Sequence, residues 1–130
     1  MNPFEKISSY ATSGMRAQAQ RLQVISENIA NADTHGYRRK LVTFDTVFDR
    51  KTDFNQIVLD RIDLDRTPGD EIFDPGHPLA DENGYLLTSN VNIMTEFADA
   101  SEANRSYEAG REIFRQAREM YSSLLEILKR

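Results

Sequence analysis

The sequence contains no cysteine and no tryptophan, and it has no long hydrophobic run. Without cysteine the chain forms no disulfide, has no thiolate nucleophile and builds no cysteine-based zinc site. The longest apolar runs, residues 57–59 and 85–87, are far shorter than the roughly 20 residues of a membrane span or the roughly 7–15 of a secretory signal core. We therefore expect no direct membrane insertion, and export from the cytoplasm only by a route that reads no such segment.

The chain also has fewer basic than acidic side chains. Sixteen basic side chains against 21 acidic ones give a net charge of -5, which disfavours nucleic acid and anionic lipid as partners. The acidic excess lies in the middle of the chain, because residues 31–91 carry seven basic and twelve acidic side chains. The 130 residues, 39% of them hydrophobic, are enough for one structural unit with a thin core.

The N-terminal stretch has the pattern of an amphipathic helix. Asn2 is a suitable cap, Pro3 fits the first helical position, and Glu5 stands where a capping box needs an acid. Turn-forming residues follow at 31–36, so the sequence predicts a helix over about 3–30. A single seam, with steps of four and three and one polar member, runs along this helix through Ala11, Met15, Gln18, Leu22, Ile25 and Ile29.

The C-terminal stretch carries the longer seam. Its members repeat at three and four over about four heptads: Ala100, Ala103, Tyr107, Gly110, Phe114, Ala117, Tyr121, Leu124 and Leu128. Asn90 or Asn92 is placed to cap a helix over about 93–129, which would be near 55 Å long at ~1.5 Å per residue. Because this seam is longer than the N-terminal helix can cover, we expect part of it to pack between subunits of an assembly.

Between the helices, short apolar segments alternate with turn residues. Residues 42–44 and 57–64 have the period-two character of strands. Turns are indicated by Pro, Gly, Asn and Asp at 67–70, 74–78 and 82–84. We predict a mainly α fold with a small β segment, in which long N- and C-terminal helices pair as an antiparallel coiled coil. The helical coiled-coil part is expected to cover 1–31 and 92–130, and the outer strand-and-turn part 32–91.

Two histidines are the only candidates for site chemistry. His35 and His77 both lie in turns that contain Asp and Gly, so a metal site or an acid–base pair is conceivable if the fold brings them together. Plain turn chemistry accounts for both residues, and the sequence has no His-x-x-x-His, no Gly-x-Ser-x-Gly and no Walker-type loop. We predict no catalytic residue, no metal and no cofactor, and a small hydrolase is the least supported alternative.

A compact basic run follows the N-terminal helix. Arg38, Arg39 and Lys40 come directly after Tyr37, a pattern that would suit phosphate contacts. In a chain whose next fifty residues are net acidic, nucleic acid is disfavoured. We instead predict possible intersubunit charge contacts between this run and acidic residues such as Asp60, Asp63 and Asp65.

Several segments resemble the bacterial flagellar rod and hook family. Residues 13–18 and 25–39 are similar to its N-terminal signature, in which an Asn-Ile-Ala-Asn core, here Asn28 to Asn31, is followed by Thr-x-Gly-Tyr. Other segments are similar to rod members of that family, namely 74–78, 83–85, 90–92 and 103–109. The resemblance covers nearly the whole chain.

The resemblance implies a structural protein of the basal-body rod, the hollow drive shaft that crosses the periplasm, with no catalysis. It implies partners among copies of the chain and other rod proteins, and export by the flagellar type III apparatus. The motif residues would fix how the inner helix turns into the outer segment: Asn28, Ile29, Ala30, Asn31, Thr34, Gly36 and Tyr37. The two seams would carry intra- and intersubunit packing.

One alternative belongs to a different class. A free-standing coiled-coil adaptor or chaperone would bind an exported partner through the exposed C-terminal seam. Such a protein has no evident need for the signature that runs from Asn28 to Tyr37, so the rod reading is preferred.

Overall fold

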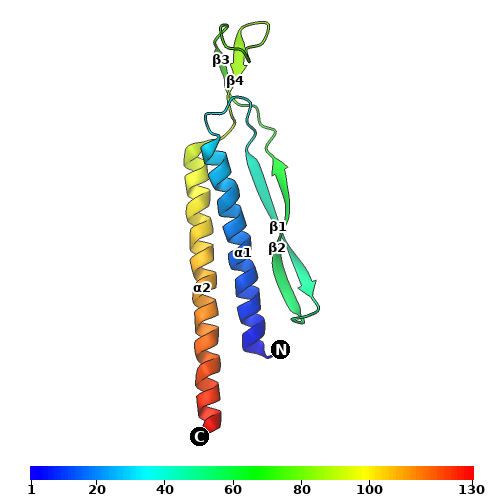
Figure 1. Cartoon of the computed structure of the whole chain (residues 1–130), viewed down its shortest axis with the longest axis vertical. Helices are drawn as coiled ribbons and strands as arrows, with labels where there is room; N and C mark the ends of the chain where they lie inside the picture. The colour runs from blue at the N-terminus through cyan, green and yellow to red at the C-terminus, as the bar shows by residue number, and fades with distance from the viewer.

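The computed structural model describes all 130 residues and consists of two long helices, one long hairpin and one short hairpin (Figure 1). The helices are α1 (Pro3–Ala30) and α2 (Ile93–Lys129). The strands between them are β1 (Lys40–Asp49), β2 (Phe54–Leu64), β3 (Glu71–Phe73) and β4 (Tyr85–Leu87). The fold is mainly helical with a small β segment, as the sequence predicts.

Side-chain caps set the start of both helices. The Glu5 N–H donates to the Asn2 side-chain oxygen at 2.8 Å, and the Asn2 N–H donates to the Glu5 carboxylate at 3.2 Å, which completes the predicted capping box. In α2 the side-chain oxygen of Asn92 accepts from the N–H groups of Met94 and Thr95. Asn92, rather than Asn90, is therefore the cap of the second helix.

The helices run side by side in opposite directions, and α2 extends past the N-terminus of α1 (Figure 1). α2 has 37 residues and α1 has 28. Near this end the rings of Phe4 and Tyr121 lie 5.9 Å apart between centroids. The residues after Tyr121, which we call the free end (122–130), lie beyond this aromatic contact.

Small residues allow the two helices to approach closely. Ala103 and Ala117 of α2 are buried, and Ala103 has no exposed surface. A Cβ atom placed on Gly110 would lie 3.0 Å from Cγ of Met15. The small members of the predicted C-terminal seam therefore mark the line along which α2 meets α1.

The long hairpin packs along a second face of α1. β1 and β2 pair antiparallel with an irregularity between Thr43 and Phe44. The Ile57 N–H donates to the Ser13 hydroxyl at 3.0 Å, and Tyr10 meets Phe54 edge-to-face with 5.8 Å between centroids. α1 is thus enclosed by α2 on one face and by β2 with β1 on another (Figure 1).

The short hairpin projects from the other end of the molecule (Figure 1). β3 and β4 pair antiparallel from Glu71 with Leu87 to Phe73 with Tyr85. The sequence indicates the turns here but not this strand pair. Gly84 has a φ of +84°, and a Cβ atom there would lie 2.9 Å from the Phe73 ring, so this turn requires glycine.

The core is thin. Only 13 of the 130 residues are buried, and the two largest side chains that are fully buried are polar: Asn28 and Glu96. Neither helix contains a stretch that is both long and apolar enough to cross a bilayer. The large side chains that the fold encloses completely therefore lie on the ends of α1 and α2 that adjoin each other, and they are polar.

Candidate assembly site: the helix–loop junction and the helix seams

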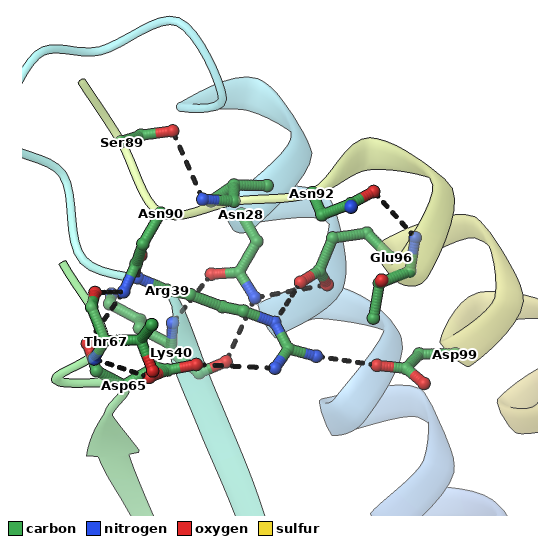
Figure 2. Close-up of polar contacts among 12 residues, drawn as sticks. Asn28, Arg39, Lys40, Asp65, Thr67, Ser89, Asn90, Asn92, Glu96 and Asp99 are labelled. Atoms are coloured by element: carbon green, nitrogen blue, oxygen red, sulfur yellow. Dashed lines mark hydrogen bonds and ion pairs between the residues drawn. The ribbon is translucent and has the colours of Figure 1, made fainter. Parts of the chain in front are cut away.

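Asn28 lies at the centre of the junction and uses its full hydrogen-bonding capacity (Figure 2). Its amide nitrogen donates to the Lys40 carbonyl at 3.0 Å and to the Glu96 carboxylate at 3.3 Å. Its oxygen accepts from the Tyr37 hydroxyl and from the Lys40 N–H, both at 2.9 Å. Because two donors and two acceptor positions are all paired, this one side chain fixes how α1 turns back into β1.

A buried ion pair lies beside Asn28. The Glu96 carboxylate has no exposed surface and accepts from Nε of Arg39. The same guanidinium donates to Asp99 at 2.8 Å and lies 3.8 Å from Asp65. Burial by itself lowers the pKa of Arg39, but the hydrogen bond and charge of Glu96, with Asp99 and Asp65, outweigh it and raise that pKa. Arg39 therefore stays charged and links α2 to the end of β2.

Asn90 bridges three segments of backbone. Its oxygen accepts from the Arg39 N–H at 2.6 Å, and its nitrogen donates to the carbonyls of Asp65 and Thr67, each at 2.8 Å. Arg38 also donates to the Thr67 carbonyl, at 2.9 Å. The entry to α2 is thus fastened to the start of β1 and to the segment after β2. We call Asn28, Arg39, Asp65, Asn90 and Glu96 the junction cluster.

Three ionisable groups around the cluster have shifted pKa values. The Thr67 backbone N–H and hydroxyl, followed by the charges of Arg39 and Arg38, hold the pKa of Asp65 below its usual range. Burial raises the pKa of Tyr37. The hydrogen bond to Glu27, 2.8 Å long, raises the pKa of Lys40.

The remaining signature residues close the end of α1. Asn31 donates to the Glu27 carbonyl at 2.8 Å, and the Thr34 hydroxyl donates to the Asn31 side-chain oxygen at 3.1 Å. Gly36 has a φ of +75°, and its N–H donates to the Leu87 carbonyl at 3.0 Å, which ties the loop to β4.

Two signature residues stand apart from the polar network. Ile29 is half-buried and Ala30 is exposed. Of the seven signature residues, Asn28 and Tyr37 make side-chain contacts at the centre of the junction.

The basic run is engaged within the chain. Arg39 binds Glu96, and Lys40 binds Glu27. Among the acidic residues considered as partners, Asp65 lies near Arg39 of the same chain, and Asp63 pairs with Arg61 at 2.8 Å. Contacts of this run with other subunits stay a prediction.

The seam residues divide by position along the helices. Ala11, Ile25, Ala103 and Ala117 are buried, and the half-buried members are Met15, Leu22, Ile29, Tyr107, Gly110, Phe114 and Tyr121. At the free end Leu124 is 41% exposed and Leu128 is 73% exposed. The seam is thus enclosed by the chain itself up to Tyr121 and open beyond it.

Sequence reasoning missed two parts of this arrangement. Ser13 and Val24 are also buried. Ser13 is polar and gives no hydrophobic signal, and Val24 lies one position before Ile25, outside the single predicted seam. Glu96 occupies the first turn of α2, where an acid is ordinarily explained by the helix dipole. Its partner Arg39 is 57 residues away in the sequence.

His35 and His77 do come together, with 5.0 Å between ring centroids in an edge-to-face arrangement. Nδ1 of His77 accepts from the Leu79 N–H at 3.1 Å, which occupies one of its two ring nitrogens. The structure contains no group of three or more His, Asp or Glu side chains placed to hold a metal ion. The contact between His35 and His77 therefore joins two loops, and no third side chain is placed beside them to complete a metal site.

Known flagellar rod proteins are similar to this chain over nearly its whole length. Residues 10–38 match the family described as flagella basal body rod protein, and residues 82–127 match flagellar basal body rod FlgEFG protein C-terminal. The flagellar basal-body rod protein FlgC of Agrobacterium fabrum is 41% identical, with 99% of this chain and 98% of that protein aligned. FlgC of Buchnera aphidicola is 35% identical and FlgC of Salmonella typhimurium 31%, each with 93% of this chain and 95% of the relative aligned.

The chain belongs to the flagellar basal-body rod protein family. The relatives that align with it over nearly their whole length are FlgC proteins, and the chain is FlgC-like. The two matched segments, 10–38 and 82–127, bring together Asn28, Asn90 and Glu96. The junction is therefore where the two family segments meet, while β1 and β2 lie outside both.

Proposed function

We propose that this chain is a non-enzymatic structural subunit of the flagellar basal-body rod. It assembles with copies of itself and with other rod proteins into the hollow shaft that transmits torque across the periplasmic space. The full-length similarity to FlgC proteins supports this function. The helix pair supports it physically, because two packed helices form a stiff rod-like element.

The observation that carries the proposal is the exposed apolar surface of the free end. Leu124, Ile127 and Leu128 are 41%, 65% and 73% exposed. Clustered exposed apolar side chains mark sites of association in soluble proteins. In an assembled rod, helices of neighbouring subunits would cover these residues.

Different parts of the chain are proposed to occupy different layers of the rod. Residues 1–31 and 92–130 are proposed to form the inner helical part of the rod, and residues 32–91 the outer part. The long hairpin then lies against the outer face of α1 and stiffens it. The signature at the end of α1 sets the angle between the inner and outer parts.

Export by the flagellar type III apparatus is part of the proposal. A chain that passes through a narrow export channel must unfold readily. With 13 buried residues out of 130, the single chain has little apolar burial to lose. Contacts with neighbours in the rod would then supply the stabilisation that the isolated chain lacks.

Quantitative mass spectrometry of purified basal bodies tests the proposal. We expect this chain in fixed proportion to the other rod proteins, together with loss of motility when the gene is deleted. Finding the chain free in the cytoplasm and absent from basal bodies would contradict the proposal and favour the adaptor.

A further inference from the structure

A groove of about 390 Å³ lies between α1 and the β1–β2 hairpin near the hairpin turn. Its apolar lining includes Val47, Phe48 and Val58, which are 49%, 56% and 37% exposed. Arg16 and Arg50 also line it and are exposed. We call this the arginine groove. Apolar surface of this kind, next to exposed charge, is typical of a site that another surface covers.

The charge of the groove is positive and unused within the chain. None of the ion pairs in the structure includes Arg16 or Arg50. Asp49 is the one acidic lining residue, and its carboxylate already accepts from the Lys51 N–H at 2.9 Å. The exposed Lys51 ammonium group adds to the positive charge beside the groove. An occupant should therefore combine apolar side chains with carboxylates.

Residues 70–87, which we call the β3–β4 end, combine exposed apolar side chains with carboxylates. The sequence contains no Lys or Arg between Arg66 and Arg105. Phe73 and Leu79 of the β3–β4 end are 64% and 66% exposed. Five carboxylates flank them in the sequence, and none takes part in an ion pair of the structure: Asp70, Glu71, Asp74, Asp81 and Glu82.

We propose that the arginine groove of one subunit binds the β3–β4 end of a second copy of this chain. Phe73 and Leu79 would cover Val47, Phe48 and Val58, while Glu71 and Asp74 face Arg16 and Arg50. Complementary charge then fixes the register of the contact. This inference rests on the proposed rod function and names one of its intersubunit surfaces.

The placement of the two surfaces determines the kind of assembly. The β3–β4 end projects from one end of the molecule, and the turn between β1 and β2 lies toward the other (Figure 1). A subunit therefore cannot fold its own β3–β4 end into its own groove. Contacts between two different surfaces run head-to-tail, and they generate open helical arrays unless the rotation closes them into a ring. This is the geometry that a rod requires.

Disulfide cross-linking tests the proposal cleanly because the chain has no cysteine of its own. The Val47→Cys/Leu79→Cys double variant should form disulfide-linked dimers and a ladder of higher oligomers in basal bodies after mild oxidation. Since the two positions lie at opposite ends of one subunit, each bond must join two copies. A matched control, Ile113→Cys/Leu79→Cys, uses an apolar position of α2 that is 50% exposed and should give no ladder.

The outcomes separate this inference from the proposed function. Absence of the unmodified chain from basal bodies would overturn both. Presence of the double variant in basal bodies without the ladder would overturn the inference alone, as would a Leu79→Cys cross-link to a different rod protein.

Charge reversal gives an independent test. Arg16→Glu/Arg50→Glu should reduce the ladder of the double-cysteine variant about tenfold or more, because like charges across an interface cost free energy. Adding Glu71→Arg/Asp74→Arg to the same chain should restore it. A ladder unchanged by the reversal, or a loss that the compensating changes do not rescue, would contradict the proposed pairing.

Discussion

The two ends of the helix pair differ in how completely side chains are buried and paired within the chain itself. At the junction, Asn28 and Glu96 are fully buried and their polar atoms are paired within the chain. At the free end, Ile127 and Leu128 expose 65% and 73% of their surface. The junction therefore specifies how one chain folds, whereas the free end has apolar surface that the chain itself does not cover. In an assembly subunit these two tasks need different chemistry.

Polar groups suit the junction because they impose direction. Apolar packing tolerates sliding of one helix past another, whereas the hydrogen bonds of Asn28 are made in one register only. A buried ion pair such as Arg39–Glu96 adds little net stability, yet the fully buried Glu96 charge would be costly without its cation. The contrast between the two ends therefore predicts large folding effects at the junction and small ones at the free end.

Replacing Glu96 by alanine should have the largest effect on folding. The change removes the buried carboxylate that accepts from Arg39 and from the Asn28 amide, although Arg39 keeps Asp99. The free energy of unfolding should therefore fall by about 2–3 kcal/mol. Urea unfolding of the purified chain, followed by far-UV circular dichroism, measures the loss. Glu102→Ala is the control on the same helix, because Glu102 is 69% exposed and lies 3.7 Å from Arg21, and it should cost below about 1 kcal/mol. Equal losses would contradict the account of the junction.

Gly110→Val tests the seam between the two ends. Its Cβ atom would lie 3.0 Å from Cγ of Met15, and overpacking of this kind costs about 1–3 kcal/mol. Ala109→Val, at the neighbouring exposed position, shows what a valine costs where there is no crowding. Valine favours helix more than glycine does, so helix propensity does not explain a loss at Gly110. Trimming the partner in a Gly110→Val/Met15→Ala double variant should recover part of the loss. If the unfolding free energy of the double variant falls by the sum of the losses in Gly110→Val and Met15→Ala, the two side chains do not meet at Gly110 and this account of the seam is wrong.

Acid should loosen the junction through Asp65. The pKa of this carboxyl is held below its usual range by Thr67 and by the two arginines. A depressed folded-state pKa contributes stability above the unfolded value of about 3.9, and that contribution is lost as the pH falls through the folded-state pKa. We therefore expect the unfolding free energy of the parent to fall more steeply below about pH 4 than that of Asp65→Asn. If the unfolding free energies of the two proteins fall equally steeply in acid, Asp65 is not a source of the acid sensitivity.

Local signals made the helices predictable. Asn2 and Asn92 cap their own helices, and the seams repeat at helical spacing, so each bound depends on residues within a few positions. The strands β1 and β2 contain the predicted segments, but the irregularity at Thr43 and Phe44 depends on cross-strand pairing. β3 and β4 have three residues each, which is too short for the alternation of apolar and polar residues that predicts a strand.

The junction was predictable only in part. The resemblance singled out Asn28 and Tyr37, and the structure places both at its centre. The sequence predicts contacts between subunits for Arg39, and its pairing with Glu96 cannot be inferred from either residue because the two are distant in the sequence. Local pattern thus gives the elements, whereas the contacts that orient them depend on residues that only the fold brings together.

Leu124→Asp should have the smallest effect on folding and still prevent assembly. Leu124 is 41% exposed at the free end, so the isolated chain should lose below about 1 kcal/mol. In the rod a neighbouring helix would bury the new carboxylate without a partner, which is unfavourable enough to exclude the variant. Mass spectrometry of basal bodies should find Leu124→Asp absent, and Ser123→Asp, which adds the same charge on another face of the helix, present. If Leu124→Asp enters the rod normally, the free end is not an interface, and the difference between the two ends has another cause.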